Sequence, residues 1–162
     1  MDYSIRSARP EDGPFLADML VEAANGNGTS ARTRVDVLAE EATRRYVAGW
    51  PRPGDLGSVA ETADGERIGA CWSRLFTSAS PGRGFIAAGV PELTLGVRPV
   101  HRAQGVGRSL LRAVVAQGRA AGYARLSLSV ASGNFARRLY VSEGFSVVAD
   151  RGDAETMVAL LR

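Results

Sequence analysis

Apolar residues in this chain follow two spacings, which predict short strands alternating with helices. Where they alternate with polar or small residues, as Leu93, Leu95 and Val97 do, one face of a strand is expected to be buried. This pattern and the turn residues between the runs predict strands over residues 3–8, 57–61, 67–76, 93–98, 124–130, 145–149 and 156–161.

Apolar residues three and four positions apart predict the helices. The clearest stripe, formed by Val106, Leu110, Leu111 and Val114, begins directly after a glycine-rich turn and ends at Gly122. Helices are expected over residues 10–24, 33–50, 106–121 and 134–142, with Asn134 as the N-cap of the last one. The NGNGTS segment after the first helix predicts a flexible loop.

The length and the order of elements indicate one α/β domain. At 162 residues the chain can bury one proper core, and we assign residues 1–162 to a single domain. The connection 77–89 is rich in Ser, Gly and Pro, and it is either a lid on the substrate side or a disordered loop.

The stretch from Leu93 to Leu111 predicts an anion site, because a strand there leads through a glycine-rich turn into a helix. The first N–H groups of a helix have no partner within it, and the helix dipole places partial positive charge there. Glycines let a phosphate approach the backbone closely. Arg102 and Arg108 add positive charge around the same turn.

Three phosphate-binding loops compete for this turn. A P-loop needs a lysine, and the chain has none. A dinucleotide fingerprint needs a third glycine where this chain has Leu110. The third pattern, Arg/Gln-x-x-Gly-x-Gly/Ala, is matched completely by Arg102-Ala-Gln-Gly105-Val-Gly107. In this respect the chain resembles the GCN5-related N-acetyltransferase (GNAT) superfamily.

A second block strengthens the resemblance. The family commonly carries Asn-x-x-Ala-x-x-Leu-Tyr-x-x-x-Gly-Phe, and this chain reads Asn134-Phe-Ala-Arg-Arg-Leu-Tyr140-Val-Ser-Glu-Gly144-Phe145, with the alanine one place early. The resemblance covers essentially the whole chain. It implies a GNAT fold, with a mixed, twisted central sheet of about seven strands and about four flanking helices.

The resemblance also implies that acetyl-CoA is the co-substrate and lies between the fourth and fifth strands. Its pantetheine would pair with backbone groups of Leu95 and Val97, and Gly96 would permit a bulge that exposes them; the alternative for Gly96 is close packing against a neighbour. Asn134 is either a pantetheine contact or only a helix cap. The residues expected around the pyrophosphate are Arg102, Gln104, Gly105, Val106, Gly107, Arg108 and Ser109.

Amide formation requires a base and an acid. An alkyl ammonium, with a pKa near ~10, must lose a proton before it attacks a thioester, and the leaving thiolate, with a pKa of about 8.5, benefits from an acid. The resemblance implies Tyr140 as the acid, against an ordinary half-buried tyrosine. Glu92 lies one residue away from the family's glutamate position, so it is either the base or a surface residue at the strand start.

Other residues carry weaker indications. His101 is expected to be exposed on the phosphate side, Trp72 is either part of the acceptor pocket or a core residue, and Cys71 is expected to be a buried small hydrophobe. The arginines are scattered, which argues against nucleic acid, and no cluster has metal-ligand spacing, so no metal is expected. No apolar run suits a membrane span or a signal peptide, and the single cysteine agrees with a cytoplasmic location.

The resemblance therefore implies an acetyl-CoA-dependent N-acetyltransferase. The acceptor would be a primary amine of a small molecule or peptide, which attacks the thioester directly. The alternative is a non-catalytic acyl-CoA-binding regulatory module. A homodimer is possible under either interpretation.

Overall fold

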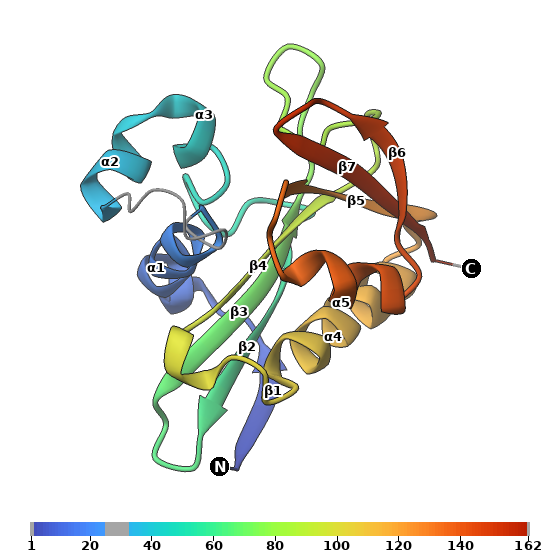
Figure 1. Cartoon of the computed structure of the whole chain (residues 1–162). Helices are drawn as coiled ribbons and strands as arrows, with labels where there is room; N and C mark the ends of the chain where they lie inside the picture. Colours follow the sequence, from blue (N-terminus) through green and yellow to red (C-terminus); the bar gives the residue numbers. More distant parts are fainter. Residues whose placement is uncertain (1, 25–32, 162) are drawn as a thin grey trace.

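A computed structural model describes residues 2–24 and 33–161 and shows one seven-stranded sheet (Figure 1). The strand order is β1-β2-β3-β4-β5-β7-β6, and every neighbouring pair is antiparallel except β4 and β5. The mixed sheet is therefore confirmed. The strands are β1 (Tyr3–Ser7), β2 (Leu56–Thr62), β3 (Arg67–Arg74), β4 (Glu92–Val97), β5 (Arg125–Ala131), β6 (Ser146–Asp150) and β7 (Ala154–Leu160).

Helices flank the sheet on both faces (Figure 1). One buried cluster joins α4 to one face, and a second joins α1 to the other. The helices are α1 (Gly13–Ala24), α2 (Arg34–Ala39), α3 (Glu41–Arg44), α4 (Val106–Ala120) and α5 (Ala136–Ser142), with short 3-10 turns η1 (Pro10–Asp12) and η2 (Pro99–His101). No helix within the described ranges is long and apolar enough to cross a membrane. The predicted NGNGTS loop lies outside the described residues.

The continuous helix predicted over residues 33–50 is wrong. Thr33 does cap a helix, since its hydroxyl accepts a hydrogen bond from the N–H of Asp36 at 3.1 Å. However, Glu40 is extended, with ψ of 126°, and it separates α2 from the single turn of α3. Beyond α3 the carbonyl oxygens of Arg45 and Ala48 accept hydrogen bonds from the guanidinium group of Arg74 on β3. Contacts with the sheet thus outweigh local helix propensity here.

Arg74 anchors this segment as part of a buried ion pair. Its side chain and that of Asp55 are each 1% exposed, and Nη2 lies 2.7 Å from Oδ2. Nearby, Nε1 of Trp72 donates to the carbonyl oxygen of Tyr46 at 3.0 Å, and Trp72 itself is buried in the core. The sheet therefore holds the chain around Tyr46 through two buried side chains.

Gly96 serves close packing, and the bulge predicted there is absent from the pairing of β3 with β4. The register runs without a shift from Gly69 opposite Val97 to Arg74 opposite Glu92. A Cβ atom at position 96 would lie only 2.4 Å from the carbonyl oxygen of Met19 in α1. The glycine is needed because the helix backbone approaches the strand this closely.

Gly96→Ala is expected to destabilise the fold by about 1–3 kcal/mol, because the added methyl group must push α1 off the sheet. Gly13→Ala is the matched control, since a Cβ atom there would meet its nearest neighbour, Trp50, at an ordinary 3.7 Å. Urea unfolding of both variants measures the difference. Equal stability of the two variants would contradict the close approach of α1.

Candidate active site

A cavity of about 730 Å³ opens where β4 and β5 separate. Its walls come from α1, β4, β5, α5 and the turn that leads into α4, so segments distant in the sequence meet there. The two predicted motifs therefore border the same cavity. The residues predicted for the site that line it are Glu92, Leu95, Val97, Arg102, Gly105, Gly107, Arg108, Asn134 and Tyr140.

The cavity exists because β4 and β5 pair at one position only among the described residues, Glu92 opposite Ser127. The N–H of Ser127 donates to the carbonyl oxygen of Pro91 at 2.9 Å, and beyond this point the two strands diverge. β4 continues beside β3, while β5 continues beside β7. Backbone groups left inside a protein without strand partners need other partners, so the gap suits an extended polar ligand.

The alternation of backbone directions shows which groups face this gap. The N–H of Arg98 donates to Ile68 on the β3 side at 2.8 Å, whereas the carbonyl of Pro91 points toward β5. Along a strand these directions alternate from residue to residue. The backbone groups of Leu95 and Val97 therefore point into the gap, on the side predicted for the pantetheine chain.

The turn before α4 has the backbone shape of an anion cradle. Ala103 and Gly105 both have positive φ, 62° and 82°, and Gly105 is the N-cap of α4. Left-handed residues in such a turn direct successive N–H groups toward one side. A side chain at position 105 would be strained at this φ, which accounts for the glycine.

Three residues predicted for the pyrophosphate do not line the cavity with their side chains. Gln104 is exposed, and Val106 is buried in the core beneath α4. The hydroxyl of Ser109 lies 3.1 Å from the hydroxyl of Tyr3 and 3.1 Å from the carbonyl oxygen of Gly105. Any role of these three residues at the anion site must come from their backbone groups.

The two arginines of the turn already have partners. Nε of Arg102 donates to the carbonyl of Val97 at 3.2 Å, its Nη2 lies 3.4 Å from Glu22, and its guanidinium stacks 5.2 Å from the ring centre of Phe135. Arg108 is paired with Glu143 in the same way. Positive charge therefore surrounds the turn, but part of it is balanced by carboxylates.

Glu92 lies in the wall of the cavity and is 3% exposed. Its Oε2 accepts a hydrogen bond from the hydroxyl of Tyr46 at 2.6 Å, while Oε1 has no partner of normal hydrogen-bond geometry among the described residues. Burial raises the pKa of Glu92 to about 7, against the lowering effects of Tyr46, the nearby backbone of Gly84 and the charge of Arg83. Glu92 is thus a buried residue, not a surface residue at the strand start.

Tyr140 lies on α5 and is 6% exposed. Its ring packs against Phe145 at 5.9 Å between centroids, and burial raises the pKa of its hydroxyl, so the phenol keeps its proton at neutral pH. Within residues 2–24 and 33–161 no hydrogen bond is found to this hydroxyl. A buried phenol on a cavity wall can donate a proton or a hydrogen bond to a ligand.

The model of the acetyltransferase (GNAT) family matches residues 20–145. The chain belongs to this family. Family membership implies an acyltransferase, and it confirms the fold that the two motifs predicted. No match is found among curated protein sequences.

Solved structures agree with the GNAT assignment at the level of the fold. The PaiA N-acetyltransferase of Thermoplasma acidophilum, in complex with coenzyme A, is 20% identical with a TM-score of 0.67 and 99% coverage of both chains. YncA of Salmonella typhimurium, with acetyl-CoA, is 24% identical with a TM-score of 0.68 and coverage of 100% and 95%. A phosphinothricin acetyltransferase of Sinorhizobium meliloti, with acetyl-CoA, is 20% identical with a TM-score of 0.69 and coverage of 99% and 89%.

Sequence reasoning missed two residues of this GNAT site. Tyr46 lies within the range of the predicted helix 33–50, and its hydroxyl joins Glu92 to the loop after β3 by accepting from the N–H of Arg83 at 2.8 Å. Arg83 itself lines the cavity. No local signal identifies either residue, because both act through contacts between segments far apart in the chain. The loop 77–89 is therefore packed onto the site.

Three further expectations can be compared with the structure. His101 is 5% exposed, so the expectation of an exposed, phosphate-side residue is wrong: the turn of η2 places it inward. Asn134 lies one residue before the N-cap, which is Phe135, although its Oδ1 accepts from the N–H of Ala136 at 2.8 Å and so still serves the first turn of α5. Cys71 is fully buried, as predicted.

Glu92→Gln is expected to stabilise the protein at alkaline pH. The native state binds the proton of Glu92 more tightly than the unfolded chain does, so the free energy of unfolding falls as pH rises from about 4.5 to about 7. Above pH 7 the wild type bears the full free-energy cost of a buried carboxylate, on the order of 3 kcal/mol. The variant does not bear this cost, because glutamine carries no charge.

Denaturant unfolding at pH 5 and pH 8 measures this effect. The difference in free energy of unfolding between variant and wild type should be larger at pH 8. The matched control is Glu66→Gln, which removes an exposed carboxyl group in the turn between β2 and β3. An equal difference in free energy of unfolding at both pH values would contradict a buried, weakly acidic Glu92.

Proposed function

We propose that this protein is an acetyl-CoA-dependent N-acetyltransferase that acetylates a primary amine of a small molecule or peptide by direct attack. The observation that carries the proposal is that a possible base and a possible acid line the same cavity. A buried carboxyl group with a pKa of about 7 and a buried, protonated phenol both line the gap between β4 and β5. A base and an acid of this kind are what transfer from a thioester to an amine requires.

The residues around the gap fit acetyl-CoA, which supplies a thioester already activated for attack. The backbone groups of Leu95 and Val97 that face the gap suit the amide-containing pantetheine arm. The turn from Arg102 to Arg108 suits the pyrophosphate, because it directs backbone N–H groups and positive charge to one place. Coenzyme A or acetyl-CoA in the structures of PaiA and YncA supports this assignment.

Glu92 is the proposed base. With a pKa of about 7, its carboxylate form is available at and above neutrality and can still bind a proton well. Oε2 accepts from Tyr46, and Oε1, which makes no hydrogen bond of normal geometry within the described residues, is the atom proposed to accept the proton of the ammonium group. The neutral amine then forms its N–C bond while the thioester C–S bond breaks.

Tyr140 is the proposed acid. Because burial keeps its hydroxyl protonated, it can give that proton to the departing sulfur and recover one from solvent after the products leave. The nitrogen loses its second surplus proton to solvent as the amide forms, so the net products are an amide, a free thiol and the one proton that Glu92 holds. No covalent enzyme intermediate is needed.

The experiment that tests this function combines binding and turnover. Thermal unfolding is measured with acetyl-CoA, CoA, ATP and NAD, and a ligand at ~100 times its Kd adds about 2.7 kcal/mol of stability. We expect a raised midpoint only with the two CoA species, and release of free thiol from acetyl-CoA when primary amines are added. Binding without turnover of any amine would favour a non-catalytic acyl-CoA-binding module instead.

Tyr140→Phe is expected to lower kcat by about 10²–10⁴-fold while leaving the affinity for acetyl-CoA within a few-fold, because only the acid is removed. Tyr123→Phe is the control, since Tyr123 lies just before β5, away from the cavity walls, and among the described residues its hydroxyl donates only to the carbonyl oxygen of Gly54, at 3.4 Å. Steady-state kinetics and thermal shifts with CoA separate the two effects. Unchanged turnover in Tyr140→Phe would remove this residue from the mechanism.

A further inference from the structure

A second cavity of about 480 Å³ adjoins the first. It lies between the loop after β3 and the turn of the β6–β7 hairpin, which are close together at the top of the molecule (Figure 1). The residues that line both cavities are Arg83, Ser129, Asp153 and Ala154. Because of these shared walls, a molecule seated in the second cavity can reach toward the first.

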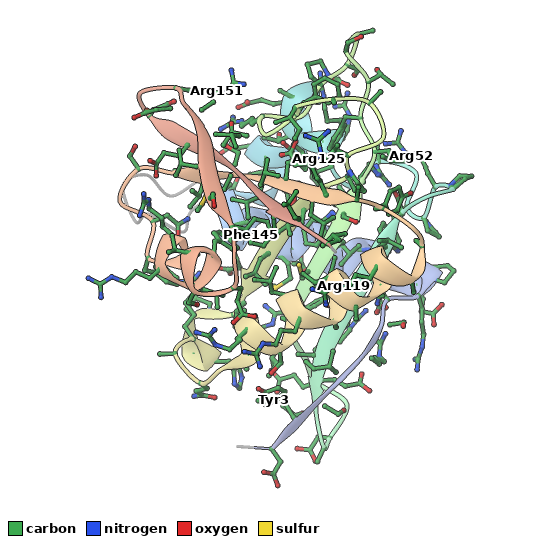
Figure 2. All side chains as sticks on the ribbon, turned by 90° about the vertical axis from the view of Figure 1, so that its right-hand side faces the viewer. Tyr3, Arg52, Arg119, Arg125, Phe145 and Arg151 are labelled. Atoms are coloured by element: carbon green, nitrogen blue, oxygen red, sulfur yellow. The ribbon has the colours of Figure 1, made fainter. Side chains whose placement is uncertain are left out.

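The second cavity carries more positive than negative charge. Arg83 and Arg151 both line it, against the single carboxylate of Asp153. Nε of Arg151 donates to the hydroxyl of Thr156 at 3.3 Å, and Arg151 extends from the hairpin (Figure 2). For the guanidinium of Arg83, no hydrogen bond or ion pair is found in the part of the chain that the structure describes.

The backbone on both sides of Arg83 is held firmly at the edge of the active site. A Cβ atom at Gly82 would lie 2.2 Å from Oε1 of Glu92, and one at Gly84 would lie 2.6 Å from the backbone of Leu128. The N–H of Arg83 also donates to the hydroxyl of Tyr46. The loop can approach this closely only because glycines flank the arginine, so the guanidinium starts from a fixed point beside the proposed base.

We propose that the acceptor is a small amine that carries an oxyanion group, foremost the carboxylate of an amino acid, bound by Arg83 and Arg151 while the amine reaches Glu92. Arginine suits this role because its planar guanidinium pairs with a carboxylate through two parallel hydrogen bonds. A polyamine is disfavoured, since two arginines and one aspartate would repel additional positive charge. This inference rests on the proposed N-acetyltransferase function and adds the substrate class.

The test uses pairs of amines that differ only in a carboxylate, such as leucine with 3-methylbutylamine and phenylalanine with 2-phenylethylamine. For each pair, the ratio of kcat/KM with and without the carboxylate is compared in wild type, Arg83→Gln and Arg151→Gln. Any effect of Arg83 on the basicity of Glu92 cancels in this ratio, because both substrates use the same base. The phosphonic acid analogue of leucine shows whether a more highly charged oxyanion is preferred.

We expect the wild type to favour the carboxylated member of each pair, and Arg83→Gln to lower that preference by about 10- to 100-fold, the value of a lost charge-assisted hydrogen bond. Arg83→Gln keeps the backbone N–H that holds Tyr46, so the loop should stay in place. Arg52→Gln is the matched control, because Arg52 is exposed and lies on the other side of the molecule from Arg151 (Figure 2). Its ratio should equal that of the wild type.

The outcomes separate this inference from the proposed function. Turnover of amines with no preference for a carboxylate, or a preference untouched in both arginine variants, would overturn the inference and leave N-acetyl transfer standing. Calorimetric binding of leucine to the CoA-loaded protein, lost in Arg83→Gln, would support the anion site even if no amine were acetylated. In that case acetyl transfer would fail and the carboxylate site would stand as a binding site without an acceptor role.

Discussion

The parting of β4 from β5 is the constraint on which the rest of this structure depends. In a sheet, each strand normally satisfies the backbone of the next, and here that pairing stops after one residue pair, Glu92 opposite Ser127. The carbonyl of Val97 accepts from Arg102, and the backbone groups of Leu95 and the N–H of Val97 are then left for a partner of extended, polar shape. Everything assigned to the site lies around this gap, including the anion cradle at one end and Glu92 at the other.

The sheet itself remains stable because each strand is fully paired on its other side, β4 with β3 and β5 with β7. Helix α4 covers one face with apolar side chains, and α1 approaches the other so closely that residue 96 must be glycine. The opening therefore lies between two hydrogen-bonded halves of the sheet. A ligand that fills it replaces the missing strand pairing.

Two opposing effects of its surroundings determine the pKa of Glu92. Burial disfavours the carboxylate, whereas the hydroxyl of Tyr46 and the charge of Arg83 favour it, and the balance leaves a pKa of about 7. Tyr46 can serve in this way only because buried Arg74 and Trp72 hold its backbone against the sheet. The structural ion pair between Arg74 and Asp55 is in this sense linked to the proposed chemistry.

Sequence reasoning succeeded where a feature depends on neighbouring residues and failed where distant segments compete. The strand, turn and helix around Gly105 were predicted because left-handed backbone and helix stripes have local signatures. The helix over 33–50 was wrong because the chain is extended at Glu40 and because Arg74 takes carbonyl groups beyond α3. The exposed position expected for His101 was wrong because packing of η2 decides its burial.

By itself, the sequence determined the order of elements, the family and the two motifs that border the cavity. Each of these depends on residues adjacent in the chain, whose backbone preferences are local. Only the tertiary structure decided what surrounds Glu92. Its partner Tyr46 lies 46 residues away in the chain, and Arg83 arrives on a loop with no periodic pattern. Such contacts depend on how the sheet brings segments together, which no local spacing of residues encodes.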